Sequence, residues 1–142
     1  MFNKKNRGFT LAELLIVILI VAIFAVLGLP GLTKTKENAI GREAQANLKL
    51  IAAAEKIYRM EAGGYYPVPT GTITSVSDIN SNLRLSLPSS SGVNWNYSVT
   101  DNTSDTFTAT ATRTTGAGAG TYAGCTWSIT HSTDKPTTET CP

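Results

Sequence analysis

Residues Arg7 to Pro30 read RGFTLAELLIVILIVAIFAVLGLP and form the most apolar part of the chain. Between Phe9 and Leu29 its only charged residue is Glu13. At about 1.5 Å of rise per residue this segment forms a helix roughly 31 Å long, which matches a hydrocarbon core of about 30 Å. The composition therefore predicts a membrane-spanning helix, and the carboxylate near its start needs an explanation.

The basic residues before this stretch predict its orientation. Lys4, Lys5 and Arg7 precede the span, whereas a long polar segment follows it, so the N-terminus is expected in the cytoplasm and the rest is expected to be exported. A secretory signal would have a shorter apolar core and a small-residue cleavage site, and no such site precedes Pro30. The apolar stretch is therefore expected to stay on the mature protein.

The remainder of the chain is close to neutral. The 142 residues include 12 basic and 10 acidic ones, so removing the three basic residues of the N-terminus leaves nine against ten. Because binding to phosphates draws on many Lys and Arg contacts, nucleic acid is not expected to be a main partner. A chain of this length has room for one ordinary domain.

Beyond Pro30 the pattern becomes amphipathic. Apolar and small residues recur in steps of four and three over residues 40–58, which predicts a helix with one packing face. The helix is expected to run from about Phe9 to Ala62 and to stop at Gly63-Gly64. Glu55 and Arg59 stand four apart, which predicts an ion pair worth about 0.3 kcal/mol.

A break is expected in the middle of this helix. Gly28, Pro30 and Gly31 predict a kink or a locally melted turn, because proline lacks an amide donor and its ring clashes with the preceding turn.

Three segments after Gly64 alternate with period two and are predicted strands: VNWNYSVT (93–100), TFTATAT (106–112) and CTWSITH (125–131). Residues 65–91 are predicted to form a long polar connection, in which Ser77 caps a short helical turn through Leu83. A small antiparallel sheet of about three to four strands is expected to pack on the amphipathic half of the helix. The predicted fold class is α+β.

Cys125 and Cys141 enclose 15 residues. In an exported domain this pair predicts a disulfide, which stabilises by about 3 kcal/mol in the chain-entropy model and ties the C-terminal tail to the third strand. The alternative is a metal site formed by both thiolates and His131, but no fourth ligand stands at a recognisable spacing. Neither a metal nor a cofactor is expected, and His131 is interpreted as a solvent-facing residue at a strand end.

The N-terminal segment KKNRGFTLAELLIVILIVAIF resembles the processing and assembly segment of type IV pilins. The shared features are a basic leader ending in Gly8, then Phe9, Thr10, Leu11 and Glu13, and a long apolar helix with a proline near Pro30. The resemblance implies cleavage between Gly8 and Phe9 by a prepilin peptidase, N-methylation of Phe9, and extraction from the inner membrane into a filament by the assembly machinery. Ala22 departs from the family, in which many members carry a glycine in this part of the span.

The resemblance also implies an organisation of the whole chain into four parts. These are a leader (1–8), a transmembrane and filament-core helix (9–30), an amphipathic half of the same helix (31–62), and a globular head with the sheet and the disulfide loop (63–142).

The resemblance offers a reason for Glu13. An acid in a membrane span is costly and needs a partner or a function. Cleavage before Phe9 creates an amine, and the family suggests that Glu13 of one subunit meets that amine on a neighbour in the filament. Such a pair selects the axial step between subunits, because it cannot be satisfied out of register. The alternative is that Glu13 merely reaches the headgroups of a single-pass anchor.

The expected function is that of a structural, non-enzymatic subunit of a type IV pilus. Its partners are other copies of itself, the prepilin peptidase, the assembly machinery and, before assembly, membrane lipid. It is expected first in the inner membrane and then on the cell surface. The alternatives are a pseudopilin of a type II secretion system and a minor pilin that binds DNA or a surface. A role in motility, adhesion or DNA uptake is left open.

Overall fold

The computed structural model describes residues 9–142, apart from residues 90–91, 102, 104, 116–118 and 139 and the side chains of residues 26–31. The chain divides into two compact units, Met1–Lys36 and Glu37–Pro142.

The first unit consists of the N-terminal part of helix α1, which is assigned over Leu11–Ala62. This agrees with the predicted helix to within two residues at its start. The expected locally melted turn at Gly28, Pro30 and Gly31 was wrong, because α1 is assigned as one continuous helix through these residues. A proline inside a helix removes one bond of the ladder, and the helix here continues on both sides of it. The expected kink stays a prediction. Among the described residues, no helix combines the length and the apolar character needed to cross a bilayer.

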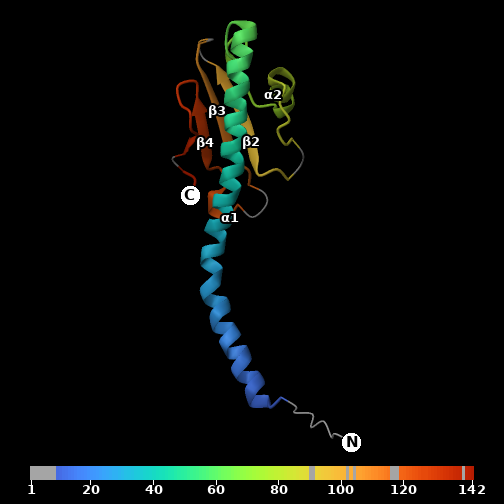
Figure 1. Cartoon of the computed structure of the whole chain (residues 1–142), viewed down its shortest axis with the longest axis vertical. Coiled ribbons are helices and arrows are strands. Elements are labelled where there is room, and N and C mark those ends of the chain that lie inside the picture. Colours follow the sequence, from blue (N-terminus) through green and yellow to red (C-terminus); the bar gives the residue numbers. More distant parts are fainter. Residues whose placement is uncertain (1–8, 90–91, 102, 104, 116–118, 139) are drawn as a thin grey trace, which may run out of the picture. The chain divides into compact units, whose positions relative to one another are not determined.

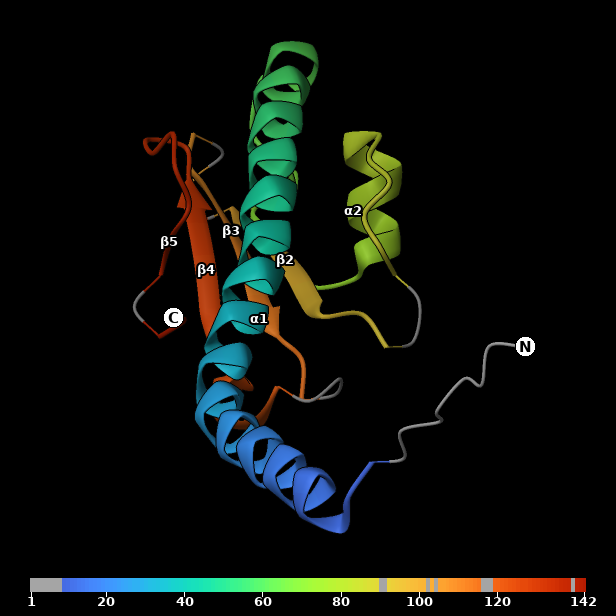
Figure 2. The same cartoon turned by 60° about the horizontal axis from the view of Figure 1, so that its bottom comes forward.

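The second unit packs the rest of α1 on one face of an antiparallel sheet, as Figures 1 and 2 show. The sheet has five strands in the order β1-β2-β3-β4-β5. A long helix on an antiparallel sheet confirms the predicted α+β class. The strands are β1 (Gly71–Ile73), β2 (Trp95–Asp101), β3 (Phe107–Arg113), β4 (Thr126–Thr130) and β5 (Thr137–Thr138), and the smaller elements are α2 (Val76–Leu83) and the 3-10 helix η1 (Gly120–Tyr122).

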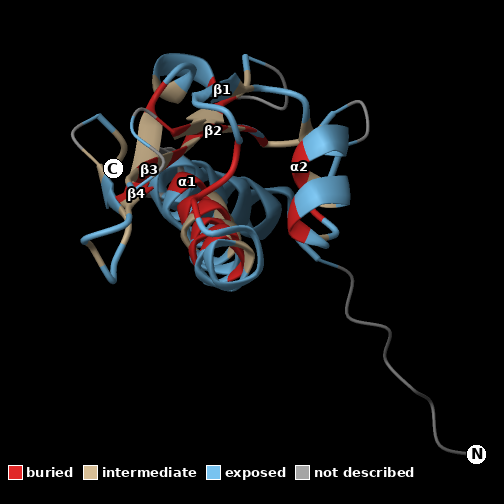
Figure 3. Ribbon diagram, turned by 90° about the horizontal axis from the view of Figure 1, so that it is seen from above, coloured by how far each residue is buried: buried red, intermediate tan, exposed pale blue. Residues whose placement is uncertain are grey.

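The core lies between α1 and the sheet, and Figure 3 marks its buried residues in red. The alternating residues of β2 and β3 face inward as predicted, because side chains point to opposite faces of a strand in turn. On α1 the buried residues follow the predicted steps of three and four. The inward residues are Trp95, Tyr97, Val99, Phe107, Ala109, Ala111 and Ile129, which meet Ala44, Leu48, Ile51 and Ala54 of α1.

Asn47, a polar residue on the packing side of α1, has a partner in the sheet. Its Nδ2 donates a hydrogen bond to the hydroxyl of Tyr97 at 2.7 Å. Burial raises the pKa of Tyr97 to about 12, so this hydroxyl stays protonated at neutral pH. The pair satisfies two polar groups that would otherwise be costly to bury.

The other face of the sheet carries only short polar side chains. They alternate with the core residues along β2, β3 and β4 and are half-buried or exposed. They are Asn96, Ser98, Thr100, Thr108, Thr110, Thr112, Thr126, Ser128 and Thr130.

The sheet has five strands where about three to four were expected. β1 has three residues and β5 has two, which is too short for a period-two pattern to reveal them. Both strands are defined by their pairing with a longer neighbour: in β1, Ile73 lies opposite Val99 of β2, and in β5, Thr137 lies opposite Ser128 of β4. The predicted helical turn also begins earlier than expected, because Ser75 rather than Ser77 is the N-cap of α2 and accepts from the Asp78 amide.

The predicted ion pair between Glu55 and Arg59 was wrong. Glu55 is buried, and its Oε2 accepts a hydrogen bond from the Tyr66 amide at 2.8 Å. Arg59 instead lies 3.0 Å from Asp105. The reason is the turn after α1, where Gly63 adopts a φ of 82° that favours glycine and returns the chain toward the helix.

Candidate assembly site

The first unit presents a continuous apolar surface. The large apolar side chains from Leu11 to Phe24 are all exposed, from 46% for Ile20 to 88% for Leu11. A contiguous exposed apolar surface of this kind marks a site that binds protein or membrane. A shallow hollow on it is lined by Leu15, Ile18, Leu19 and Ala22.

Thr10 and Glu13 bond reciprocally at the start of α1. Glu13 Oε2 accepts from the Thr10 amide at 2.9 Å and from the Thr10 hydroxyl at 2.8 Å, and the Glu13 amide donates to Thr10 Oγ1 at 3.2 Å. This is a capping box, in which two side chains satisfy backbone donors at the helix start. The carboxylate is therefore held beside residue 10.

The structure brings part of the predicted site together. Glu13 lies in the first turn of α1 against Thr10, which directly follows Phe9, and the Phe9 side chain is 82% exposed. Gly8 and Pro30 lie outside the described residues and side chains. The bonding role of Thr10 was missed, although its spacing of three from Glu13 is the sequence signal of a capping box.

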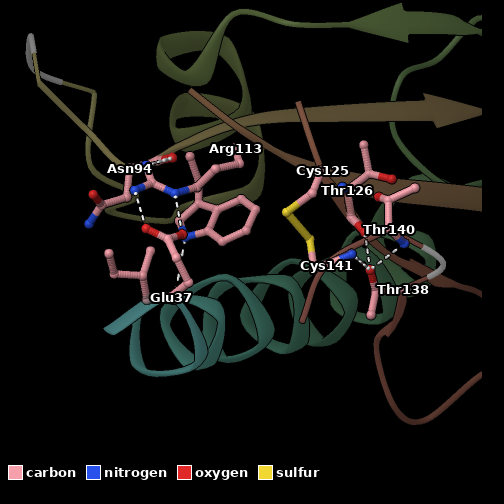
Figure 4. Close-up of a disulfide and its surroundings, with 10 residues drawn as sticks. Glu37, Asn94, Arg113, Cys125, Thr126, Thr138, Thr140 and Cys141 are labelled. Atoms are coloured by element: carbon pink, nitrogen blue, oxygen red, sulfur yellow. Dashed lines mark hydrogen bonds and ion pairs between the residues drawn. A yellow bond between two sulfur atoms is a disulfide. The ribbon is translucent and has the colours of Figure 1, made fainter. Parts of the chain in front are cut away.

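A buried ion pair fastens α1 to the sheet at the start of the second unit (Figure 4). Arg113 Nε lies 3.0 Å from Glu37 Oε2, and Arg113 Nη2 lies 3.1 Å from Glu37 Oε1. Arg113 Nη1 also donates to the carbonyl of Asn94 at 3.0 Å. Because two parallel bonds fix both side chains, the pair holds the first turn of this unit's helix at the end of β3.

The C-terminal tail is held by a disulfide and a group of threonines (Figure 4). Cys125, which directly precedes β4, is bonded to Cys141. The hydroxyl of Thr138 accepts from the Cys141 amide at 2.9 Å and donates to the Thr126 carbonyl at 2.6 Å. The Thr126 amide donates to Thr140 Oγ1 at 3.0 Å. The tail therefore closes the edge of the sheet beside β4.

The described residues do not form the alternative metal site of His131 and the two cysteines. His131 is exposed just after β4, where it was expected. Among the described residues, no three His, Cys, Asp or Glu side chains gather in a way that could hold a metal ion.

Comparisons with known proteins agree with the N-terminal pattern. Residues 3–29 match the family model of the prokaryotic N-terminal methylation motif. The chain is 41% identical over 64 residues to the type IV major pilin protein PilA of Myxococcus xanthus (strain DK1622), a match that covers 45% of this chain and 29% of that protein. It is 32% identical over 74 residues to the type II secretion system core protein G of Escherichia coli (strain K12), covering 52% and 50% of the two chains.

A third relative is the competence protein ComGC of Streptococcus pneumoniae serotype 4, with 35% identity over 59 residues, covering 42% of this chain and 55% of that protein. The matched region thus spans between 29% and 55% of the length of these three relatives. No solved structure gives a significant match.

The chain thus combines the N-terminal methylation motif with one long helix and an antiparallel sheet. The motif and the likeness to a major pilin, to core protein G and to ComGC support a type IV pilin-like protein, as the resemblance led us to expect.

Proposed function

We propose that the protein is the structural subunit of a bacterial type IV pilus, assembled from the inner membrane into a helical filament through the N-terminal part of α1. The apolar surface of residues 11–24 supports this proposal, because it needs lipid or protein to cover it. The likeness to a type IV major pilin supports it as well.

The subunit has two successive environments in this proposal. Residues 9–30 first span the inner membrane, with the N-terminus in the cytoplasm and the rest exported. The prepilin peptidase cleaves between Gly8 and Phe9, and Phe9 is N-methylated. The assembly machinery then moves the subunit into the filament, where copies of the same segment replace lipid. The role is structural rather than enzymatic.

The observation that carries the proposal is the capping box. Thr10 holds the Glu13 carboxylate beside the residue that becomes the new N-terminus. The amine of Phe9 on a neighbouring subunit can then meet a carboxylate that is already held in place. Because a buried charge needs its partner, this pair permits one axial register between the two subunits. Pro30 is assigned a role in shaping the same helix for assembly.

A pseudopilin of a type II secretion system is the second candidate. The likeness to core protein G favours it, because that match covers half of both chains. The disulfide between Cys125 and Cys141 supports a pilus subunit in this proposal, since the resemblance to pilins implies a C-terminal loop closed by two cysteines. A minor pilin that binds DNA is disfavoured, because residues 64–142 hold three basic and five acidic residues.

The test is to express the chain as the only pilin and to analyse sheared surface material by mass spectrometry. We expect long fibres whose subunit begins at methylated Phe9. Glu13→Leu should insert and be cleaved but give almost no fibres, because it leaves a desolvated amine without its partner, at a cost of about 3–5 kcal/mol per contact. Asp105→Leu, which removes an exposed acid outside α1, is the control.

Two outcomes would contradict the proposal. Fibres that retain residues 1–8 would exclude processing before assembly. A normal fibre yield from Glu13→Leu would mean that the carboxylate does not drive assembly.

A further inference from the structure

The side of the sheet opposite α1 contains a hollow. We call this side the polar face; it consists of the short polar side chains of β2, β3 and β4 together with Thr72 and Thr137. At the β4–β5 edge lies a hollow of about 300 Å³, lined by the hydroxyl side chains of Thr126, Ser128, Thr137, Thr138 and Thr140. Sites for small molecules have volumes of roughly 300–1,000 Å³, so the hollow is large enough for a small ligand or for one unit of a polymer.

The hydroxyls of this hollow fall into two groups. Thr138 and Thr140 are used by the fold, since the Thr138 hydroxyl donates to the Thr126 carbonyl and Thr140 Oγ1 accepts from the Thr126 amide (Figure 4). The hydroxyls of Thr126, Ser128 and Thr137 bond to no other residue that the structure describes. Because a hydroxyl donates one hydrogen bond and accepts up to two, these three are available to a ligand.

The hollow continues into a row of hydroxyls across the sheet. Ser98 lies opposite Thr110, Thr110 lies opposite Ser128, and Ser128 lies opposite Thr137. These residues alternate with core residues along their strands, so they share the polar face. Neighbouring strands lie about 4.8 Å apart, so the row is roughly 14 Å long. An extended polymer could therefore contact several strands at once.

The chemistry of the polar face selects a neutral ligand. Its described residues include no charged and no aromatic side chain. Phosphates and nucleic acids draw their affinity from Lys and Arg contacts, which these residues do not offer. An apolar partner would bury the hydroxyls without hydrogen bonds, which costs free energy. A neutral sugar carries hydroxyls of its own that both donate and accept, so it can satisfy those of the face.

We propose that this hollow and the adjoining row bind an uncharged polysaccharide. The free hydroxyls of Thr126, Ser128 and Thr137 form hydrogen bonds with its sugar units. The disulfide and the Thr138 hydroxyl hold the tail beside β4, so the site is formed before the ligand arrives.

The inference goes beyond the proposed filament function and does not require it, because the site lies within one chain. Each site is weak, since it consists of neutral hydrogen bonds without a stacking ring. A filament would strengthen the binding, because many copies of the site could engage one polymer at the same time.

Retention on neutral resins tests the proposal. The detergent-solubilised full chain is passed over three columns that carry a glucan, a mannan and a galactan. We expect it to be retarded on at least one of them. The retardation should not decrease when the salt concentration is raised, because salt screens charges and this contact contains none.

Paired variants locate the contact. Ser128→Ala combined with Thr137→Val removes two free hydroxyls and should lower the retention about tenfold, the loss expected for one or two neutral hydrogen bonds. Thr137→Ser keeps its hydroxyl and should still be retained. Ser77→Ala combined with Thr121→Val is the matched control, since it removes exposed hydroxyls from α2 and η1. Denaturant unfolding of both double variants should match that of wild type, which excludes a loss of structure.

Three outcomes would overturn the inference. The first is no retardation on any of the three neutral columns. The second is retardation on a sulfated dextran column alone, lost at high salt, which would assign the face to an anionic polymer. The third is equal retention of the two double variants, which would place the contact elsewhere. A chain that forms no fibres would contradict the proposed function but not this site, because the columns measure the solubilised subunit.

Discussion

Arg113 and Glu37, which are 76 residues apart in the sequence, form a two-pronged ion pair whose side chains are 0% and 3% exposed. The Trp95 ring lies beside it, 5.9 Å from the Arg113 guanidinium carbon. Trp95 Nε1 also donates to the Ile40 carbonyl at 3.0 Å. Three side chains therefore tie the first turns of α1 in the second unit to β2 and β3.

We predict that Glu37→Gln destabilises the protein by about 3–5 kcal/mol, because it leaves the Arg113 charge buried without its counter-charge. Denaturant unfolding of the full chain in detergent, followed by tryptophan fluorescence, measures the effect. Glu61→Gln, which removes an acid from the exposed pair with Arg84, is the control and should cost at most about 1 kcal/mol. Equal losses of unfolding free energy from the two changes would mean that the buried pair stabilises the fold no more than the exposed pair does.

Thr10 is predicted to act through Glu13. Thr10→Val keeps the size of the side chain but removes the hydroxyl that bonds the carboxylate, which should cost the helix start about 1 kcal/mol and lower the fibre yield. Thr10→Ser should retain both functions. The measurement is fibre yield beside the amount of cleaved subunit in the membrane. A yield unchanged by Thr10→Val, with cleavage intact, would argue against preorganisation.

The Glu55 carboxyl predicts a pH dependence of stability. Burial, together with the nearby Asp101, raises its pKa from 4.5 to about 7, although the hydrogen bond from Tyr66 opposes the shift. The folded state therefore holds this proton more tightly than the unfolded state. The resulting stabilisation is complete below about pH 4.5 and is lost as the pH rises through 7, roughly 3 kcal/mol in all.

Glu55→Gln removes this titration while nearly keeping the shape of the side chain. Between pH 4.5 and pH 8 wild type should lose stability that the variant keeps, so the unfolding free energy of the variant should rise relative to that of wild type. Denaturant unfolding of both proteins at several pH values measures this change. A difference that does not vary with pH would show that Glu55 titrates normally.

The disulfide is predicted to stabilise the second unit rather than the N-terminal contacts between subunits. Cys125→Ser should lower the unfolding free energy by about 3 kcal/mol, because it releases the loop that ends at Cys141. A reducing agent should have the same effect on wild type and none on the variant. If reduction destabilised the two proteins equally, the bond would not be the cause.

Features that depend on neighbouring residues could be predicted from the sequence. The long helix follows from an uninterrupted apolar run joined to steps of four and three, and the inward faces of β2 and β3 follow from strict alternation. The pilin-like N-terminus is likewise a local motif of Gly8, Phe9 and Glu13. Each of these signals is contained in a short segment, so no knowledge of the fold was needed.

Tertiary structure alone decided the partners of the buried polar groups. Glu55 had a suitable partner four residues away in Arg59, yet it bonds to Tyr66, because the turn at Gly63 brings that amide into the core. The pairing of Glu37 with Arg113 and the strands β1 and β5 have no local signal either. Their energy comes from desolvation and from bonds across the fold, and these depend on which distant segments meet.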